Sequence, residues 1–404
     1  MMRLATISMM ALALSACATD GMDGEQGPAG EGGEDGENGT DGTDGTDGQQ
    51  GPEGPAGPQL ALPAVYTLSN PSGVNQVAAY LRATTGSLSR MGRFDTGGMG
   101  TGGGLGSQGA LVYDASSGRF FAVNTGDDSI SMLALDRTGR LAELSTVDSG
   151  GVRPVSVAVR GGTVYVANQG DTAATPVNAN ISGFRVTGDD LVPIAGSTRP
   201  LSATTDVRPT NIAFTPDGKF VVVAERFAHK LSTFALVDGV AQAGAFHTSA
   251  GMQPFAIDFS PEGYLVVAEV GAGAANGSSV SSYSISSTGT LTPITSALAT
   301  NQTAACWLVV SGGFAYVANA ASATITGVAI AENGALTLRD ASGVTAPTGA
   351  GAIDLAVTPD RGFLYSLAGS PRAIHVFEIA SDGGLTARPT LTGVSATAAG
   401  LVAR

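Results

Sequence analysis

A strand-and-turn unit that recurs about every fifty residues is the feature of this sequence that most restricts its fold. Each copy combines an alternating strand, a glycine turn and an apolar residue two positions after the glycine. The clearest copies are Gly86-Ser87-Leu88, Gly139-Arg140-Leu141, Gly289-Thr290-Leu291 and Gly334-Ala335-Leu336, and looser copies surround Gly188, Gly239 and Gly383. Units of this length built from short strands are typical of β-propeller blades. We therefore predict an all-β fold, a seven-bladed β-propeller.

The two ends of the repeat region complement each other. Apolar inner strands precede tight turns at 111–113, 156–159, 212–214, 257–259, 308–310 and 355–357. These are six inner strands for seven glycine turns, because the first repeat has none. The last residues, 399–403, have the pattern of an inner strand without a blade after it. We predict that this C-terminal strand completes the first blade and closes the ring, which leaves no open seam between sheets.

The first seventeen residues have the pattern of a bacterial lipoprotein signal. A basic start is followed by an uncharged apolar run from Leu4 to Ala16, which is too short to span a bilayer. The run ends in Leu14-Ser15-Ala16-Cys17, which resembles the lipobox. We predict a signal peptide over 1–16 and acylation of Cys17. The residue after Cys17 is not aspartate, which favours the outer membrane, with the protein facing the periplasm or the cell surface. The alternative is an ordinary signal with a chance cysteine.

Residues 17–59 are predicted to be a tether. Glycine occupies every third position in thirteen consecutive triplets from Gly21 to Gly57. Only glycine fits the axis of a collagen-like triple helix, so this segment could form a homotrimeric stalk. However, it also holds eleven acidic residues and no Lys or Arg, and like charges would repel in a trimer. A hydrated monomeric stalk is therefore the alternative. The propeller domain is therefore predicted to span residues 60–404.

Charge argues against nucleic acid as a partner. The net charge of −14 belongs mostly to the tether, since the propeller has 23 acidic and 19 basic residues. No basic stripe of the kind that follows a phosphate backbone is present. No cofactor is predicted, although a divalent cation could be held by paired carboxylates.

Several motifs resemble a known propeller family. They are Tyr165-Val166-Ala167-Asn168, Tyr316-Val317-Ala318-Asn319, Thr215-Pro216-Asp217-Gly218-Lys219-Phe220 and the Gly349-Ala350-Gly351 run. The chain resembles the lactonase propellers, which include bacterial 6-phosphogluconolactonase-like proteins and fungal carboxymuconate-lactonising enzymes. The resemblance covers almost all of residues 60–404. It implies the propeller fold, and lactone hydrolysis as an activity, but one fold carries many functions.

The catalytic pattern of that family is only partly present. Active members typically have an Arg-His pair at the start of an inner strand and a Glu at the end of the neighbouring strand. Thr210 and Asn211 stand at the Arg-His positions, and Arg208 is the nearest substitute in charge. Glu225 matches the family Glu approximately, with a strand that is one residue short. The resemblance therefore makes Glu225 and Arg208 candidates for catalysis. The missing Arg-His pair, however, weakens the case that this chain is a lactonase.

Polar residues are predicted to gather on one face of the propeller. Second strands end, and inner strands begin, on the same face of a blade. That face is expected to hold Asn70, Asn124, Asn168, Glu225, Glu269 and Asn319, together with Arg153, Arg208 and Gln253. Glu225 and Glu269, in adjacent blades, are the candidate acid and base. Asn124, Asn168, Asn319, Arg153 and His229 are the candidate ligand-binding residues, although Asn side chains in turns often bond their own backbone.

Other residue types add little chemistry. The three histidines, His229, His247 and His375, lack the close spacing of metal ligands, so no metal site is predicted. Trp307 is expected in the core, with a stacking platform for a ligand as the alternative.

The leading hypothesis is a lipid-anchored extracytoplasmic propeller that binds or displays a small-molecule or protein ligand. The alternatives are a lactone hydrolase and a surface structure assembled through the stalk.

Overall fold

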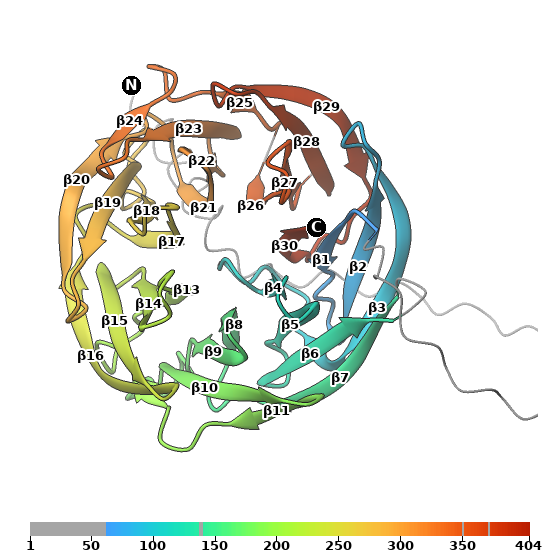
Figure 1. Cartoon of the computed structure of the whole chain (residues 1–404), viewed down its shortest axis with the longest axis vertical. Coiled ribbons are helices and arrows are strands. Elements are labelled where there is room, and N and C mark those ends of the chain that lie inside the picture. Colours follow the sequence, from blue (N-terminus) through green and yellow to red (C-terminus); the bar gives the residue numbers. More distant parts are fainter. Residues whose placement is uncertain (1–61, 137–139, 350, 371) are drawn as a thin grey trace, which may run out of the picture.

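The structure is a computed structural model that describes residues 62–136, 140–349, 351–370 and 372–404. The predicted signal, Cys17 and the Gly-X-Y segment lie outside these residues. Within the described residues the chain forms thirty β-strands and no helix, so no membrane-spanning helix occurs there. The strands group into seven sheets, which stand in a ring around a central axis (Figure 1). The prediction of an all-β, seven-bladed propeller is confirmed.

Each blade is one antiparallel sheet, and its strands run outwards from the axis in chain order, except in blade 1. Blade 1 contains β30 (Ala399–Ala403), β1 (Ala64–Leu68), β2 (Gly73–Arg82) and β3 (Leu88–Gly100). Blade 2 contains β4 (Leu111–Asp114), β5 (Arg119–Asn124), β6 (Ser129–Leu135) and β7 (Leu141–Asp148). Blade 3 contains β8 (Pro154–Arg160), β9 (Thr163–Asn168), β10 (Asn180–Thr187) and β11 (Asp190–Pro193), with β12 (Arg199–Pro200) beside β10.

The remaining four blades repeat this plan. Blade 4 contains β13 (Pro209–Phe214), β14 (Phe220–Glu225), β15 (Lys230–Val237) and β16 (Val240–Thr248). Blade 5 contains β17 (Pro254–Phe259), β18 (Leu265–Glu269), β19 (Ser279–Ile285) and β20 (Leu291–Ala299). Blade 6 contains β21 (Ala305–Ser311), β22 (Phe314–Asn319), β23 (Thr324–Ile330) and β24 (Leu336–Leu338), with β25 (Ala346–Pro347) beside β23. Blade 7 contains β26 (Ala352–Val357), β27 (Phe363–Ala368), β28 (Ala373–Ile379) and β29 (Leu385–Thr392).

The C-terminal strand closes the ring, as predicted. Strand β30 pairs with β1 in an antiparallel register that places Tyr66 opposite Val402 and Thr67 opposite Leu401. The backbones of Ala64 and Arg404 exchange two hydrogen bonds, of 3.1 and 2.8 Å. Blade 1 is therefore assembled from both ends of the propeller sequence, and the first and last blades are held together by a sheet rather than by side chains alone.

Burial follows the position of a strand within its blade. Every residue of β14 and β18 is buried, because second strands lie between neighbouring blades. The outer strand β16 has mostly half-buried and exposed residues, as expected for a strand with one face in water. The continuous runs of Val and Ala in the second strands therefore supply the core, and the alternating third and fourth strands supply the outer surface.

At three junctions of the ring, a tyrosine hydroxyl of one blade bonds to a glycine turn of the next blade. The Tyr316 hydroxyl of blade 6 donates a hydrogen bond of 3.1 Å to the Gly383 carbonyl of blade 7, and Tyr365 of blade 7 donates one of 2.8 Å to Gly86 of blade 1. Gly383 has a φ of +78°, and a Cβ there would lie 2.6 Å from the ring of Phe314. Only glycine satisfies both limits. The glycine turn that defines the sequence repeat is thus a contact between blades.

The inner strands are linked around the channel by polar side chains. Three of these side chains each accept a hydrogen bond from a backbone N–H of the next inner strand: Ser156 from Ile212 at 3.1 Å, Asn211 from Ile257 at 2.9 Å and Asp258 from Val310 at 2.8 Å. Trp307 belongs to the core, since it is 3 % exposed. Its indole donates a 2.9 Å hydrogen bond to the Ser107 carbonyl. These bonds satisfy backbone groups that would otherwise face the channel unpaired.

Candidate functional site

The structure places the predicted residues on one face of the ring, which we call the mouth face. Register pairs join second-strand ends to inner-strand starts there: Asn168 to Pro154, Glu225 to Pro209, Glu269 to Pro254 and Asn319 to Ala305. The order of strands within a blade therefore brings these positions to one face, as the sequence suggested. The direction and the contacts of each side chain determine whether it can reach a ligand.

Glu225 is enclosed by serines and has no exposed surface. Its carboxylate accepts hydrogen bonds from the hydroxyls of Ser202 and Ser232. The Ser202 backbone N–H lies 3.3 Å from both carboxylate oxygens. Burial raises the pKa of this carboxyl group above its usual value, and the serine hydrogen bonds partly offset that rise. Glu225 therefore holds the loop between blades 3 and 4 in place, and no route to solvent is open at its carboxylate.

Glu269 occupies the same position in blade 5 and is equally buried. It accepts hydrogen bonds from the Ser249 hydroxyl at 3.0 Å, the Gly251 N–H at 2.8 Å, and the Ser279 and Ser281 hydroxyls at 2.5 and 2.7 Å. Burial is the main cause that raises the pKa of this group. Four donors around one carboxylate leave little capacity for a ligand.

The two glutamates do not form a shared site. Each is bonded to its own set of donors in a separate blade, with no hydrogen bond between them. A cation site is also not visible, because the described residues contain no group of three or more His, Cys, Asp or Glu side chains that could hold a metal ion.

Asparagine takes the place of glutamate in three other blades. Asn124, Asn168 and Asn319 are all fully buried. Asn124 donates hydrogen bonds of 3.1 and 2.7 Å to the hydroxyls of Ser129 and Ser131. Asn319 donates bonds of 3.1 and 2.8 Å to Thr324 and Thr326 at the equivalent positions, and Asn168 donates to Ser149 and Asn180. The common pattern ties the end of the second strand to the third strand, so these side chains point into the blades and not into the channel.

The two residues that replace the Arg-His pair are also used by the fold. The Thr210 hydroxyl donates a 2.7 Å hydrogen bond to the Phe255 carbonyl of blade 5. The Asn211 side chain accepts from Ile257 at 2.9 Å and donates to the Gln108 carbonyl at 3.2 Å. Neither residue can act as a general base or acid, because a hydroxyl and an amide do not titrate near neutral pH.

Arg153, Arg208 and Gln253 form an arc at the starts of three adjacent inner strands. All three have left-handed backbone conformations, with φ of 58°, 49° and 57°. The equivalent residues of blades 6 and 7 are small: Ala304 and Gly351. A large side chain in this conformation costs free energy that glycine avoids, and such positions concentrate at functional sites. Blades 3 to 5 thus carry the distinctive part of the mouth face.

His229 joins blade 4 to blade 5 beside this arc. Its Nδ1 accepts a 3.1 Å hydrogen bond from the backbone N–H of Gln253. This contact fixes the orientation of the His229 ring between the two blades. The other histidines lie elsewhere: the His247 ring is 3.3 Å from the Thr233 hydroxyl, and His375 is 3.3 Å from Thr390 on the outer strand of blade 7.

The residues directly after Glu225 were not among the sequence-based candidates. Arg226 is 3 % exposed, and its Nε donates a 3.1 Å hydrogen bond to the side-chain oxygen of Gln253. Phe227 is 40 % exposed. The sequence matched the family glutamate with a strand one residue short, and the position one residue further along is Arg226. That offset was the available signal for the position of Arg226.

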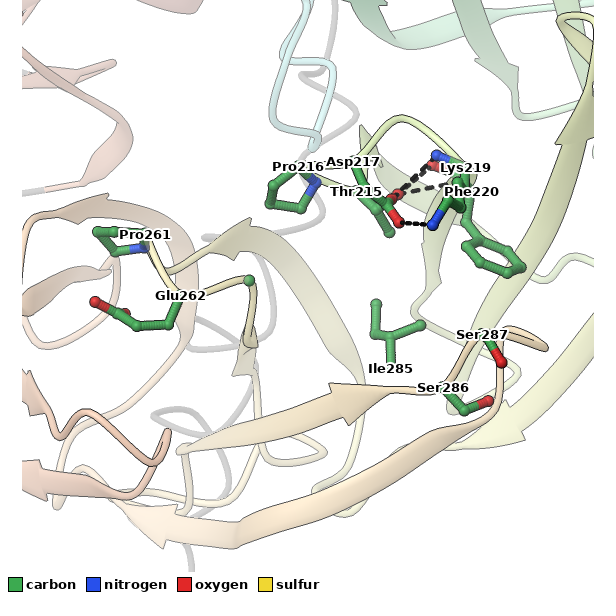
Figure 2. A pocket seen from close by; sticks show the side chains of 11 residues that line it. Thr215, Pro216, Asp217, Lys219, Phe220, Pro261, Glu262, Ile285, Ser286 and Ser287 are labelled. Carbon is green, nitrogen blue, oxygen red and sulfur yellow. Dashed lines mark hydrogen bonds and ion pairs between the residues drawn. The ribbon is translucent and has the colours of Figure 1, made fainter.

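A separate pocket of about 390 Å³ lies on the face opposite the mouth, between blades 4 and 5 (Figure 2). It is formed by the turn after β13, the turn after β17 and the tip of the β19–β20 hairpin. Lys219 is ion-paired with Asp217 at 3.2 Å on its rim, and Phe220 and Ile285 supply apolar surface. None of the predicted site residues lines this pocket.

Comparison with known proteins agrees with the fold. Residues 194–309 match the family model described as lactonase, 7-bladed beta-propeller. No curated protein matches the chain.

Three solved structures illustrate the similarity. A protein from Bacteroides uniformis ATCC 8492, provisionally named a 6-phosphogluconolactonase, is 21 % identical, with a TM-score of 0.65 over 84 % of this chain and 99 % of that one. The periplasmic gluconolactonase of Pseudomonas aeruginosa is 18 % identical, with a TM-score of 0.62 over 83 % and 98 %. A protein of unknown function from Desulfotomaculum acetoxidans DSM 771 is 15 % identical, with a TM-score of 0.64 over 85 % and 98 %. At these identities the likeness is one of fold: the chain is a seven-bladed β-propeller that is similar to the lactonase propellers, with the family match confined to residues 194–309.

Proposed function

We propose that this protein binds a small ligand at its mouth face and does not hydrolyse lactones. The observation that carries the proposal is the use of the expected catalytic groups by the fold. Glu225 and Glu269 have no exposed surface and are enclosed by serine donors. A general acid or base must come within hydrogen-bond reach of its substrate, and neither carboxylate can do so without opening its blade.

The rival proposal is a lactone hydrolase, and the names of the Bacteroides and Pseudomonas proteins favour it. It would take Glu225, Glu269 and Arg208 as catalytic residues. In this chain, however, Arg208 is held by Asp206 through an ion pair of 2.7 Å. A hydrolase would therefore need both a rearranged blade 4 and a new acid–base group, whereas a binding protein needs neither.

Lactone hydrolysis by the detergent-solubilised full chain separates these proposals. We expect no turnover of gluconolactone or 6-phosphogluconolactone above the buffer rate in a pH-stat. Loss of a positioned acid or base typically costs about 10²–10⁴-fold in rate, so a true hydrolase would stand clear of the background. Turnover that disappears in Glu225→Gln but survives in the control Glu262→Gln, on the opposite face, would establish the hydrolase and overturn the binding proposal.

The protein is further proposed to be anchored to the outer membrane through an acylated Cys17, with the propeller on its periplasmic or external side. Strand β1 begins at Ala64 on the face opposite the mouth, since its other end, Leu68, pairs with the start of β30. The chain thus enters the propeller on the face turned away from the ligand site. An anchor in this arrangement leaves the mouth open to solvent, which supports a role in binding or display.

Anchoring is tested by mass spectrometry and cell fractionation. We expect an acylated N-terminal cysteine and membrane association of the wild type, and soluble protein for Cys17→Ala. An unmodified N-terminus elsewhere in the chain would disprove the anchor. Sedimentation of the solubilised protein tests the third proposal, a surface structure built by a trimeric stalk, because a monomer at low and high salt would exclude it.

A further inference from the structure

We propose that the pocket between blades 4 and 5, on the face opposite the mouth, binds a small organic cation that carries a guanidinium group on a short aliphatic chain. This site is separate from the mouth face and does not rest on the function proposed above. The equivalent pocket between blades 3 and 4 holds an arginine side chain of the protein, and the pocket between blades 4 and 5 has no arginine in that place.

The two pockets are built from the same parts of successive blades. The pocket between blades 4 and 5 has a volume of about 390 Å³ and is lined by the turn after β13, the turn after β17 and the tip of the β19–β20 hairpin, which surround it in Figure 2. The pocket between blades 3 and 4 has a volume of about 270 Å³ and is lined by the turn after β8, the turn after β13 and the tip of the β15–β16 hairpin. Each pocket therefore lies at one junction of neighbouring blades.

Arg160 spans the pocket between blades 3 and 4. It is the last residue of β8, and its Nη2 donates a hydrogen bond to the Pro216 carbonyl in the turn of blade 4. A Cβ on Gly218 would lie 3.1 Å from the Arg160 Nε, so the side chain passes close to that turn. Phe214 and Leu236 line the same pocket and supply apolar surface for a methylene stem. The protein thus fills this junction with a guanidinium group bound to a backbone carbonyl.

Thr215 stands at the position of Arg160 one blade further on. Each lies six residues after the proline that begins its inner strand. The Thr215 hydroxyl stays within its own turn, where it donates a 2.7 Å hydrogen bond to Asp217, and the side chain is too short to cross the pocket. The Pro261 carbonyl corresponds to that of Pro216, but it accepts no hydrogen bond from any described residue. This carbonyl is therefore available to a donor from outside the chain.

The junction between blades 4 and 5 also lacks the tyrosine contact of its neighbour. Val222 lies three residues before the end of β14, where blade 3 has Tyr165 in β9. The Gly289 carbonyl of the blade 5 turn accepts a 2.9 Å hydrogen bond from Thr233 in place of a tyrosine. On a face that otherwise repeats its blade contacts, this junction is an exception, because neither a tyrosine nor an arginine crosses it.

The lining of the pocket selects a cation with an apolar stem. Lys219 is paired with Asp217 at 3.2 Å, so neither charge is free. In Figure 2 the Glu262 carboxylate lies on the side of its turn away from Ile285. It does not contact the ligand, but its negative charge favours a cation over an anion at this rim. Ile285 and Phe220 provide apolar surface, and a guanidinium group offers five N–H donors to carbonyl oxygens.

Titration of the solubilised full chain with n-propylguanidine, which has the shape of an arginine side chain, tests the inference by calorimetry. N-propylurea is the neutral analogue of similar shape, and butyrate is an anion of similar length. We expect saturable binding of propylguanidine, and binding at least about tenfold weaker for the other two, because only the guanidinium makes charge-assisted hydrogen bonds to a carbonyl. Acetylarginine amide compares an arginine side chain of a polypeptide with a free guanidine, and the tighter ligand identifies the source.

Exchange of residues between the two pockets is the sharper test. Thr215→Arg supplies the arginine from within the chain and should weaken propylguanidine binding about tenfold or more, since the side chain competes for the same carbonyl. Arg160→Thr is the reverse exchange, and crystals of this variant soaked in propylguanidine should show the ligand at both junctions. If Thr215→Arg fails to fold by circular dichroism, Ser287→Trp, at the exposed hairpin tip of the pocket, decides the outcome by blocking it.

The matched control is Val237→Trp, because Val237 is 57 % exposed at the end of β15 and lines neither pocket. It should bind propylguanidine as the wild type does. Equal binding of propylguanidine and propylurea, unchanged binding in a folded Thr215→Arg or Ser287→Trp variant, or no response of the wild type would overturn the inference. Ligand at one junction only in Arg160→Thr would likewise show that the position of the arginine does not define the site.

Discussion

The mouth face and the opposite face of the ring are built from the same repeat, but the residues at equivalent positions vary more from blade to blade at the mouth face. On the face opposite the mouth, the same contact recurs: a tyrosine of one blade bonds to the glycine turn of the next, as in Tyr316 with Gly383 and Tyr365 with Gly86. At the mouth face, the equivalent positions differ from blade to blade. The uniform end acts as scaffold, and the variable end is where this chain can differ in function from its relatives.

The variation at the mouth face has two layers. The buried layer at the second-strand ends is Asn in blades 2, 3 and 6, Glu in blades 4 and 5, Ala in blade 7 and Leu in blade 1. The outer layer at the inner-strand starts is Arg153, Arg208 and Gln253 in blades 3 to 5, of which Arg153 is exposed and the other two are half-buried. The buried layer holds each blade together, whereas the outer layer reaches the surface of the mouth face. Predictions can therefore be ordered by how much of the scaffold each change removes.

The largest effect is expected from deletion of residues 398–404. This deletion removes β30, the C-terminal strand that completes blade 1 by pairing with β1. Leu401 and Val402 are buried in β30, and burying one such side chain stabilises by about 1.5–3 kcal/mol. With the lost β1 hydrogen bonds, we expect the free energy of unfolding to fall by about 5 kcal/mol or more, and the exposed β1 edge to promote aggregation. Thermal unfolding measures this. An unchanged melting temperature would mean that blade contacts alone close the ring.

A smaller but still large effect is expected at the buried layer of the mouth face. Glu269→Ala leaves one N–H and three hydroxyls without their acceptor, and each unsatisfied group costs about 1–3 kcal/mol. Because hydroxyls can turn to other partners, we expect a loss of about 3 kcal/mol in urea unfolding.

Glu269→Gln is the control for that change. Its oxygen can still accept from the Gly251 N–H, and its NH₂ can donate to Ser279, so the loss should stay near 1 kcal/mol. Equal losses for the two variants would show that the charge, and not the hydrogen-bond pattern, stabilises this position.

The sequence was sufficient to predict the ring, the blade count and the closing strand, since glycine turns and apolar runs repeat with a fixed spacing. It did not predict β12 and β25, which are two-residue strands formed where a longer loop folds back on its own blade. These depend on tertiary contacts and leave no pattern of their own.

The candidate site was predicted in position but not in side-chain direction. Glu225, Glu269 and the asparagines lie at the expected strand ends, but they turn into the blades because serines and threonines of the third strand receive them. Gly251 contains a usable signal: a Cβ there would lie 1.9 Å from the Glu269 carboxylate. A glycine two residues before Gln253, and likewise before Arg153, leaves room for a buried polar side chain. Such a pairing of distant positions is hard to recognise in one sequence.

An intermediate effect, dependent on pH, is expected in the channel between the two ends. Asp258 accepts hydrogen bonds from Phe259 and Val310, both at 2.8 Å, and burial raises its pKa from 3.8 to about 6. The folded state therefore binds a proton more tightly than the unfolded state does. This contribution is fully present below about pH 4 and is lost as pH rises towards 6, by up to about 3 kcal/mol.

Urea unfolding between pH 4 and 7 checks the sign. Asp258→Asn should make the decline shallower without removing it, because an amide does not titrate but burial also raises the pKa values of Asp354, Glu225 and Glu269. Acids with lowered pKa values, such as Asp217 and Asp360, act in the opposite direction but below about pH 4, so the two effects separate. Stability that rises steadily from pH 4 to 7 in the wild type would contradict this assignment.

The smallest effect is expected at the uniform end of the blades, where single contacts are repeated many times. Tyr316→Phe removes one hydrogen bond to Gly383, and a neutral hydrogen bond contributes about 0.5–1.5 kcal/mol. Tyr264→Phe is the control, because the Tyr264 ring packs against the Gly334 turn while its hydroxyl makes no hydrogen bond to any described residue. We expect a loss of about 1 kcal/mol for Tyr316→Phe and little change for Tyr264→Phe, measured by urea unfolding. If the two losses were equal instead, the tyrosine–glycine contact would not stabilise the ring, and the division between a uniform scaffold face and a variable mouth face would have to be abandoned.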